Sequence, residues 1–216
     1  MSEKDDEPTP GRTECKRQAI LDAATELFLR NGFRGTSMDE VATRAGVSKQ
    51  TVYKQFTDKE RLFRDIVEGV ASNSDAVIAT LTSAFGDSAA TSSRALETRL
   101  RSVALVYLDA VLNPRVLSLR RLIIAEADAF PDLARSYYDY GPGQGVEVVA
   151  QCLQPYIDAG LLVVNESRLA AAHFAYLALG SALDRAQFMP DDLPDSAERQ
   201  RLSTAAAAAF VAAYGA

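Results

Sequence analysis

Three basic side chains, those of Arg44, Lys49 and Lys54, occupy residues 41–57, a window that contains no acid. The whole chain carries a formal charge of −6, so this window differs in sign from its surroundings. Arginine and lysine pair with phosphate oxygens, lysine can also donate to guanine, and the neighbouring Gln50 can bond to adenine. The chemistry that this window offers is hydrogen bonding to a nucleic acid.

The same window is predicted to form two short helices joined by a tight turn. Ser37 and Glu40 have the spacing of a capping box at the start of the first helix, and Ser48 can cap the second. Gly46 is the residue type that most easily takes the left-handed backbone at a helix end. This is the pattern of a helix-turn-helix, whose second helix lies in the major groove of DNA. The alternative is a solvated helix pair in an all-α core, which the short, polar second helix disfavours.

Two longer helices are expected to hold this pair in place. Thr13 can cap a helix that runs to about residue 30 and ends at Asn31 and Gly32. Thr57, with Glu60 three residues on, can open another helix that runs to about residue 85. Residues 13–65 are therefore predicted to form a three-helix DNA-binding domain, and residues 66–216 a second helical domain.

Helix signals continue through this second domain, with no strand pattern. Asn113 and Pro114 are expected to end one helix and begin the next. The run Gly141-Pro142-Gly143 is expected to interrupt a later helix, and Pro155 to kink the one that follows. A loop is predicted at residues 86–93.

The last two predicted helices, residues 166–187 and 196–214, are rich in alanine and other small residues. Two copies of such a helix pair could form a four-helix interface between two chains. We expect a homodimer, because major-groove readers of this kind usually bind two half-sites. The alternative is that these helices only form intramolecular core.

Bulk properties exclude several classes of protein. The chain has two cysteines, Cys15 and Cys152, too few for a disulfide framework, which favours a reducing cytosol. No apolar run is long enough to span a bilayer, and the N-terminus is acidic, unlike a signal peptide. We therefore expect a cytoplasmic protein with no membrane partner, and we expect the acidic residues 1–12 to be disordered.

Catalytic and metal-binding patterns are weak. His173 is the only histidine, and no cluster of cysteine, histidine and carboxylate accompanies it, so a packing role is preferred to a metal site. Cys152 and His173 could in principle form a nucleophile pair, but no catalytic signature surrounds them. We expect neither an enzyme nor a bound cofactor. A helix-bundle interaction protein that uses the helix-turn-helix for protein contact is the remaining alternative.

Aromatic and charged side chains in the second domain are candidates for the lining of a ligand pocket, which needs apolar walls and a few polar groups. A stripe of tyrosine and phenylalanine at helical spacing is, however, more often core. The candidates are Tyr107, Arg121, Glu126, Phe130, Tyr137, Tyr138, His173 and Phe174, with Tyr176 beside them.

Residues 20–63 read ILDAATELFLRNGFRGTSMDEVATRAGVSKQTVYKQFTDKERLF. This segment resembles the N-terminal domain of the tetracycline-repressor (TetR) family, and the resemblance covers about residues 13–65. RLIIAEADAFPDLA, which begins at Arg121, is similar to C-terminal domains in one branch of that family. The resemblance implies an all-α homodimer that binds a palindromic operator and is usually released by a small molecule in its C-terminal domain.

The resemblance also implies DNA-contacting roles for residues at matching positions. Thr36 and Ser37 match the start of the family's second helix, which contacts phosphate. The recognition helix begins at Ser48, Lys49, Gln50 and Thr51, and its phosphate-facing part is matched by Tyr53 and Lys54. Lys59 matches a phosphate contact at the start of the fourth helix, and Arg44 could reach a base or a phosphate.

Overall fold

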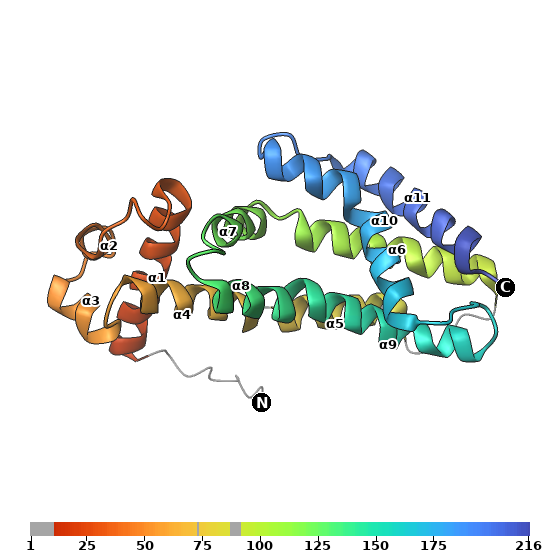
Figure 1. Ribbon diagram of the computed structural model, residues 1–216, viewed down its shortest axis with the longest axis horizontal. Coiled ribbons are helices and arrows are strands. Elements are labelled where there is room, and N and C mark those ends of the chain that lie inside the picture. The colour runs from red at the N-terminus through yellow and green to blue at the C-terminus, as the bar shows by residue number, and fades with distance from the viewer. Residues whose placement is uncertain (1–10, 73, 87–91) are drawn as a thin grey trace, which may run out of the picture. The chain divides into compact units, whose positions relative to one another are not determined.

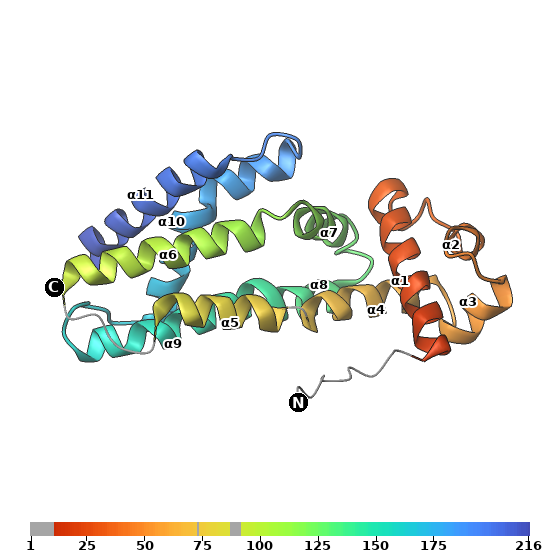
Figure 2. The same cartoon turned by 180° about the vertical axis from the view of Figure 1, so that it is seen from behind.

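The computed structural model describes residues 11–72, 74–86 and 92–216, and this part of the chain is almost entirely helical (Figure 1 and Figure 2). The helices in chain order are α1 (Arg12–Asn31), α2 (Met38–Arg44), α3 (Lys49–Gln55), α4 (Lys59–Ser72), α5 (Ser74–Phe85), α6 (Ser93–Val111), α7 (Pro114–Ala125), α8 (Pro131–Tyr138), η1 (Asp139–Gly143), α9 (Gln144–Asp158), α10 (Ser167–Phe188) and α11 (Ser196–Tyr214). Within these ranges the one extended pairing is an isolated antiparallel bridge between Leu162 and Gly215. The prediction of an all-α fold is confirmed.

The chain divides into two units, Met1–Gly69 and Val70–Ala216, and the division falls inside α4. The predicted acidic tail lies mostly outside the described residues, as does most of the predicted loop at residues 86–93. One helix was expected to run from about residue 57 to residue 85. The structure has α4 up to Ser72 and α5 from Ser74, and residue 73 between them is not among the described residues.

The first helix begins earlier than the sequence suggests. Gly11, not Thr13, is the N-cap of α1, and its carbonyl accepts from the backbone N–H of Cys15 at 3.1 Å. The prediction that Thr13 caps this helix is therefore wrong, because Thr13 already lies in the first turn. At the other end the helix stops at Asn31, where Gly32 has a φ of +74°.

Three aromatic rings hold α1 against α4. The ring centroids of Phe28 and Phe33 are 5.6 Å apart, those of Phe28 and Phe63 are 5.6 Å apart, and those of Phe33 and Phe63 are 5.1 Å apart. Such pairs add to the free energy of burial through the attraction of ring edges for ring faces. The start of α4 is fixed by Asp58, whose Oδ1 accepts from the N–H of Arg61 at 2.7 Å. The cap is thus one residue beyond the predicted Thr57.

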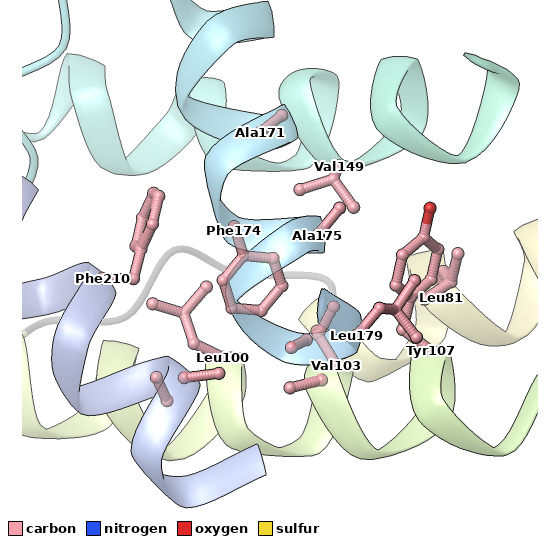
Figure 3. Close-up of a cluster of buried hydrophobic side chains, with 14 of the residues drawn as sticks. Leu81, Leu100, Val103, Tyr107, Val149, Ala171, Phe174, Ala175, Leu179 and Phe210 are labelled. Atoms are coloured by element: carbon pink, nitrogen blue, oxygen red, sulfur yellow. The ribbon is translucent and has the colours of Figure 1, made fainter. Parts of the chain in front are cut away.

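The core of the second unit is built around α10, which contacts α6, α9 and α11. Figure 3 shows Phe174 of α10 among Leu100 and Val103 of α6 and Phe210 of α11. Phe174 and Phe210 are fully buried, and their ring centroids are 5.3 Å apart. Because alanines occupy much of the buried face of α10, its backbone can lie close to its neighbours.

Two proline signals in this unit had different outcomes. Asn113 caps α7 by accepting from the N–H of Arg115 at 2.9 Å, and Pro114 is the first residue of that helix, as predicted. The expected interruption at Gly141-Pro142-Gly143 is wrong, because the chain stays helical from α8 through η1 into α9 (Figure 1). Proline has no N–H to donate, and the wider turn of a π-helix accommodates it without ending the helix.

The boundaries of the last two helices lie close to the predicted ones. α10 spans Ser167–Phe188 and α11 spans Ser196–Tyr214. No single helix among the described residues is long and apolar enough to cross a bilayer. Taken together, α6 and α7 have sufficient length and apolar composition, but the pair is bent by 64° where the two helices meet. The apolar faces of both helices are buried in the protein core.

Candidate nucleic-acid interface

Backbone caps define the corner between α2 and α3. Ser37 and Glu40 form the predicted capping box, in which the backbone N–H of Ser37 donates to Glu40 at 2.8 Å and the N–H of Glu40 donates to the Ser37 hydroxyl at 3.2 Å. The hydrogen bonds from Ser37 lower the pKa of the Glu40 carboxyl, since they favour its charged form. Gly46 has a φ of +66° at the turn, and the Ser48 hydroxyl accepts from the N–H of Thr51 at 3.1 Å.

One side of α3 is buried and the other is open to solvent. Val52 and Phe56 are fully buried, so they anchor the helix to the rest of its unit. Lys49, Gln50, Tyr53 and Lys54 are exposed, and Thr51 is half-buried. The predicted recognition residues Lys49 and Gln50 therefore lie outside the packed interior, on a short helix that is capped at its N-terminus.

Two of the basic side chains near this surface form ion pairs with acids of the same unit. The Lys49 amine lies 2.5 Å from Asp39 of α2. The Arg44 guanidinium donates through Nε and Nη2 to Glu26 of α1, with distances of 2.5 to 3.0 Å. All four side chains are about half exposed or more, so these are surface pairs that can exchange for phosphate or base contacts.

Thr36 and Lys59 have structural partners that the sequence did not reveal. Thr36 is only 2% exposed, and its hydroxyl donates to the carbonyl of Gly32 at 3.0 Å. The Lys59 amine donates to the carbonyls of Phe33 and Thr36 at 2.8 and 2.9 Å and lies 4.5 Å from the Phe33 ring centroid. Lys59 therefore fastens the start of α4 to the segment that leads into α2, and its amine is directed at the protein backbone.

A further contact that sequence reasoning missed joins α1 to α3 and α4. Arg17 pairs with Asp65 at 2.6 Å, and its guanidinium carbon lies 5.1 Å from the centroid of the Phe56 ring. Arg61 pairs with the same carboxylate at 2.8 Å. Because the Asp65 side chain is only 9% exposed, this cluster positions the buried end of α3. The spacing of Arg61 and Asp65 at i and i+4 was visible in the sequence, but the contact with Arg17 was not.

The second unit contains a cavity of about 240 Å³. Most of its lining is aliphatic, with side chains from α5, α6, α7, α9 and α10. The lining residues that carry polar side-chain groups are Arg120 and the tyrosines Tyr107, Tyr137, Tyr138 and Tyr176. Burial raises the pKa of Tyr107 to about 12, and it also raises the pKa of Tyr137, so both phenols are neutral hydrogen-bond donors near pH 7.

The structure brings some of the predicted pocket residues to this cavity and places others elsewhere. Tyr107, Tyr137 and Tyr138 line it, whereas Glu126 and Phe130 do not. Arg121 donates to the carbonyl of Ala186 and to Ser118, and the guanidinium at the cavity is that of Arg120. His173 bonds to the hydroxyl of Tyr214, and Phe174 is packed in the core against Phe210. Adjacent residues of a helix point about 100° apart, and here Arg120 faces the cavity while Arg121 points to Ala186 and Ser118.

The described residues contain no group of three or more histidine, cysteine and carboxylate side chains that could hold a metal ion. Burial raises the pKa of the Cys152 thiol, which disfavours the thiolate that a nucleophile requires. His173 is engaged with Tyr214 instead. The fold and the exposed face of α3 thus define a helix-turn-helix DNA-binding protein with a separate helical unit.

Comparison with known proteins agrees with this class and narrows it. Residues 98–216 match the family described as the C-terminal domain of AefR-like transcriptional repressors, and residues 20–66 match the family of bacterial regulatory proteins described as the tetR family. The chain belongs to the TetR family of transcriptional regulators.

Two solved structures and two curated relatives illustrate the similarity. A putative TetR-family regulator from Mesorhizobium loti MAFF303099 is 36% identical, with 96% of this chain and 100% of the other covered and a TM-score of 0.83. The flavonoid-responsive regulator FrrA is 30% identical, with 93% and 97% covered and a TM-score of 0.66. The regulator AcrR of Shigella flexneri is 46% identical over 57 residues, which are 26% of each chain. SrpR of Pseudomonas putida is 24% identical over 157 residues, which are 73% of this chain and 68% of SrpR.

Proposed function

We propose that this chain is a dimeric repressor that binds a palindromic DNA operator and leaves it when a small molecule occupies the cavity of the second unit. The observation that carries the DNA-binding part is the exposed face of α3, which presents Lys49, Gln50, Tyr53 and Lys54 to solvent. Buried Val52 anchors the opposite face of the helix. Lys49 and Gln50 near its N-terminus suit base contacts, and Tyr53 and Lys54 suit phosphate contacts. Repression would be steric, by occupation of a promoter, and the protein would act in the cytoplasm.

The exposed surface of the last two helices supports the dimer. α10 leaves Leu169 (47% exposed), Leu177 (45%) and Phe188 (78%) in contact with solvent. α11 exposes a row of alanines that includes Ala205, Ala208, Ala209, Ala212 and Ala213. Exposed apolar side chains beside a row of small ones suit close packing of helices from a second copy. We propose that two copies pair through α10 and α11.

The cavity supports release by a small molecule. It has apolar walls with a few polar groups, which is the composition of small-molecule sites. FrrA, which is 30% identical, is described as responsive to flavonoids. Occupation can weaken operator binding only if the ligand prefers one of two arrangements of the protein. The arrangement that binds DNA must place two α3 helices about 34–36 Å apart, one turn of the duplex.

Selection of bound duplexes from a random pool, followed by a mobility shift with the selected sequence, tests this proposal. We expect a two-fold symmetric consensus and a single shifted band with the mass of a dimer on DNA. Sedimentation of the free protein tests the dimer, and Leu177→Glu should weaken it without changing the fold. A wild-type protein that binds no duplex at low salt, or a chain that is monomeric at micromolar concentration, contradicts the proposal.

A further inference from the structure

The polar groups of the cavity gather around one guanidinium. Arg120 and four tyrosines, Tyr107, Tyr137, Tyr138 and Tyr176, line the same cavity. These side chains come from α6, α7, α8 and α10, so it is the tertiary fold that brings them together. The rest of the lining is mainly aliphatic. The cavity therefore offers a polar group of phenols and one cation, and an apolar remainder.

The position of the Tyr107 hydroxyl depends on a glycine. A Cβ atom added at Gly145 of α9 would lie 2.8 Å from that hydroxyl, closer than real Cβ contacts allow. Tyr107 is 6% exposed, so its ring is packed among other side chains. Gly145 thus leaves the space in which the phenol stands beside the cavity.

Arg120, unlike Arg121 and Arg199, has no hydrogen bond or ion pair with any described residue. Arg121, the next residue of α7, donates to the carbonyl of Ala186, and Arg199 pairs with Asp109 at 2.7 Å. Arg120 is half-buried and borders a largely apolar cavity. A cation in such surroundings is strongly stabilised by an anion, because the low local dielectric strengthens the attraction.

The geometry points to a small apolar monoanion, such as a carboxylic acid, as the ligand of this cavity. Its charged group lies at Arg120 and the tyrosine hydroxyls, and its hydrocarbon part lies against the aliphatic walls. This inference rests on the proposed function, in which the cavity binds the effector. A carboxylate accepts several hydrogen bonds, and those from a guanidinium are charge-assisted and geometrically specific. The neutral phenols of Tyr107 and Tyr137 can serve as further donors.

Size supports a small molecule. The cavity of about 240 Å³ lies below the range of roughly 300–1,000 Å³ that is usual for drug-sized ligands. An eight-carbon chain or a two-ring aromatic group is of suitable dimensions. Each of these skeletons occurs in common acids with a single carboxyl group. The two skeletons are distinguished by experiment.

The test compares carboxylates with amides of the same shape. Octanoate and octanamide form the aliphatic pair, and 2-naphthoate and 2-naphthamide form the aromatic pair. Calorimetry and thermal shift on the full chain without DNA should show one carboxylate binding roughly tenfold more tightly than its amide, because only the carboxylate pairs with Arg120. Arg120→Met should remove this preference, and Arg120→Lys should keep part of it.

Arg121→Met is the matched control, since it removes the neighbouring guanidinium, which bonds elsewhere. It should keep the preference for the carboxylate. Three results overturn the inference: no binding of either carboxylate, amides that bind as tightly as the acids, or a preference that survives in Arg120→Met. A protein that binds its operator but prefers amides overturns the inference alone, whereas a protein that binds carboxylates through Arg120 but no DNA overturns the proposed function alone.

Discussion

Asp39→Asn is expected to tighten DNA binding, because Asp39 competes with DNA for the amine of Lys49. The two side chains lie 2.5 Å apart, and they are 54% and 66% exposed. An exposed ion pair contributes about 0.2–1 kcal/mol, so releasing Lys49 before binding should strengthen the complex by roughly 1.4- to 5-fold. The lost negative charge beside the phosphates acts in the same direction. Both effects are screened by salt, so the gain should shrink above about 0.1 M salt.

Fluorescence anisotropy with the selected operator at several salt concentrations measures this effect. Glu68→Gln is the control, since it removes one exposed negative charge from the same unit without touching Lys49. Asp39 also lies in the first turn of α2, where a negative charge interacts favourably with the helix dipole. Thermal unfolding of Asp39→Asn should therefore show a small loss of stability. Binding by Asp39→Asn that is equal to or weaker than binding by Glu68→Gln refutes the reasoning. Weaker binding would mean that Asp39 holds Lys49 in its DNA-binding position.

Four further predictions concern single side chains. Lys54→Ala should weaken binding to all duplexes and flatten the salt slope by about one, whereas Gln50→Ala should change base preference in a repeated selection. Lys59→Met should lower the free energy of unfolding in urea by about 1–3 kcal/mol, since it removes two charged hydrogen bonds to carbonyls. It should leave the salt dependence of DNA binding unchanged. A flatter salt dependence at unchanged stability would instead indicate that Lys59 contacts a phosphate. Burial raises the pKa of Tyr107 from 10.0 to about 12, so its contribution to stability is complete below about pH 10 and is lost as the pH rises through 12. The free energy of unfolding, measured between about pH 9 and 12, should show this loss in the wild type and less of it in Tyr107→Phe.

Local signals in the sequence were reliable where both partners lie within one turn of helix. The capping box of Ser37 and Glu40, the turn at Gly46 and the start of α7 at Pro114 all form as predicted. Such contacts depend on residues three or four positions apart, and the backbone itself brings them together. The predictions were wrong where two neighbouring residues can both cap a helix, or where the backbone can accommodate a proline without ending the helix. Asp58 replaces Thr57 as a cap, and a π-helical turn accommodates Pro142 where an interruption was expected.

Long-range partners of the interface residues were not predictable from one sequence. Two of these contacts join different helices, Lys49 with Asp39 and Arg44 with Glu26, and a third joins Lys59 of α4 to the carbonyl of Phe33 in the turn after α1. A charge pattern shows that a lysine is available, but it does not show which carboxylate or carbonyl faces it. The roles of the exposed residues of α3 in base or phosphate contact stay predictions.

The sequence by itself determined the all-α class and the helix-turn-helix, because periodicity, caps and the basic window are local properties of the chain, and its resemblance to known proteins indicated the family. Only the tertiary structure decided which side chains share a cavity. It placed Arg120 there in preference to Arg121, and it gave Tyr107 its place through the missing side chain of Gly145. The physical reason is that a cavity is made by side chains from helices far apart in the chain, and a rotation of one residue along a helix turns a side chain by about 100°.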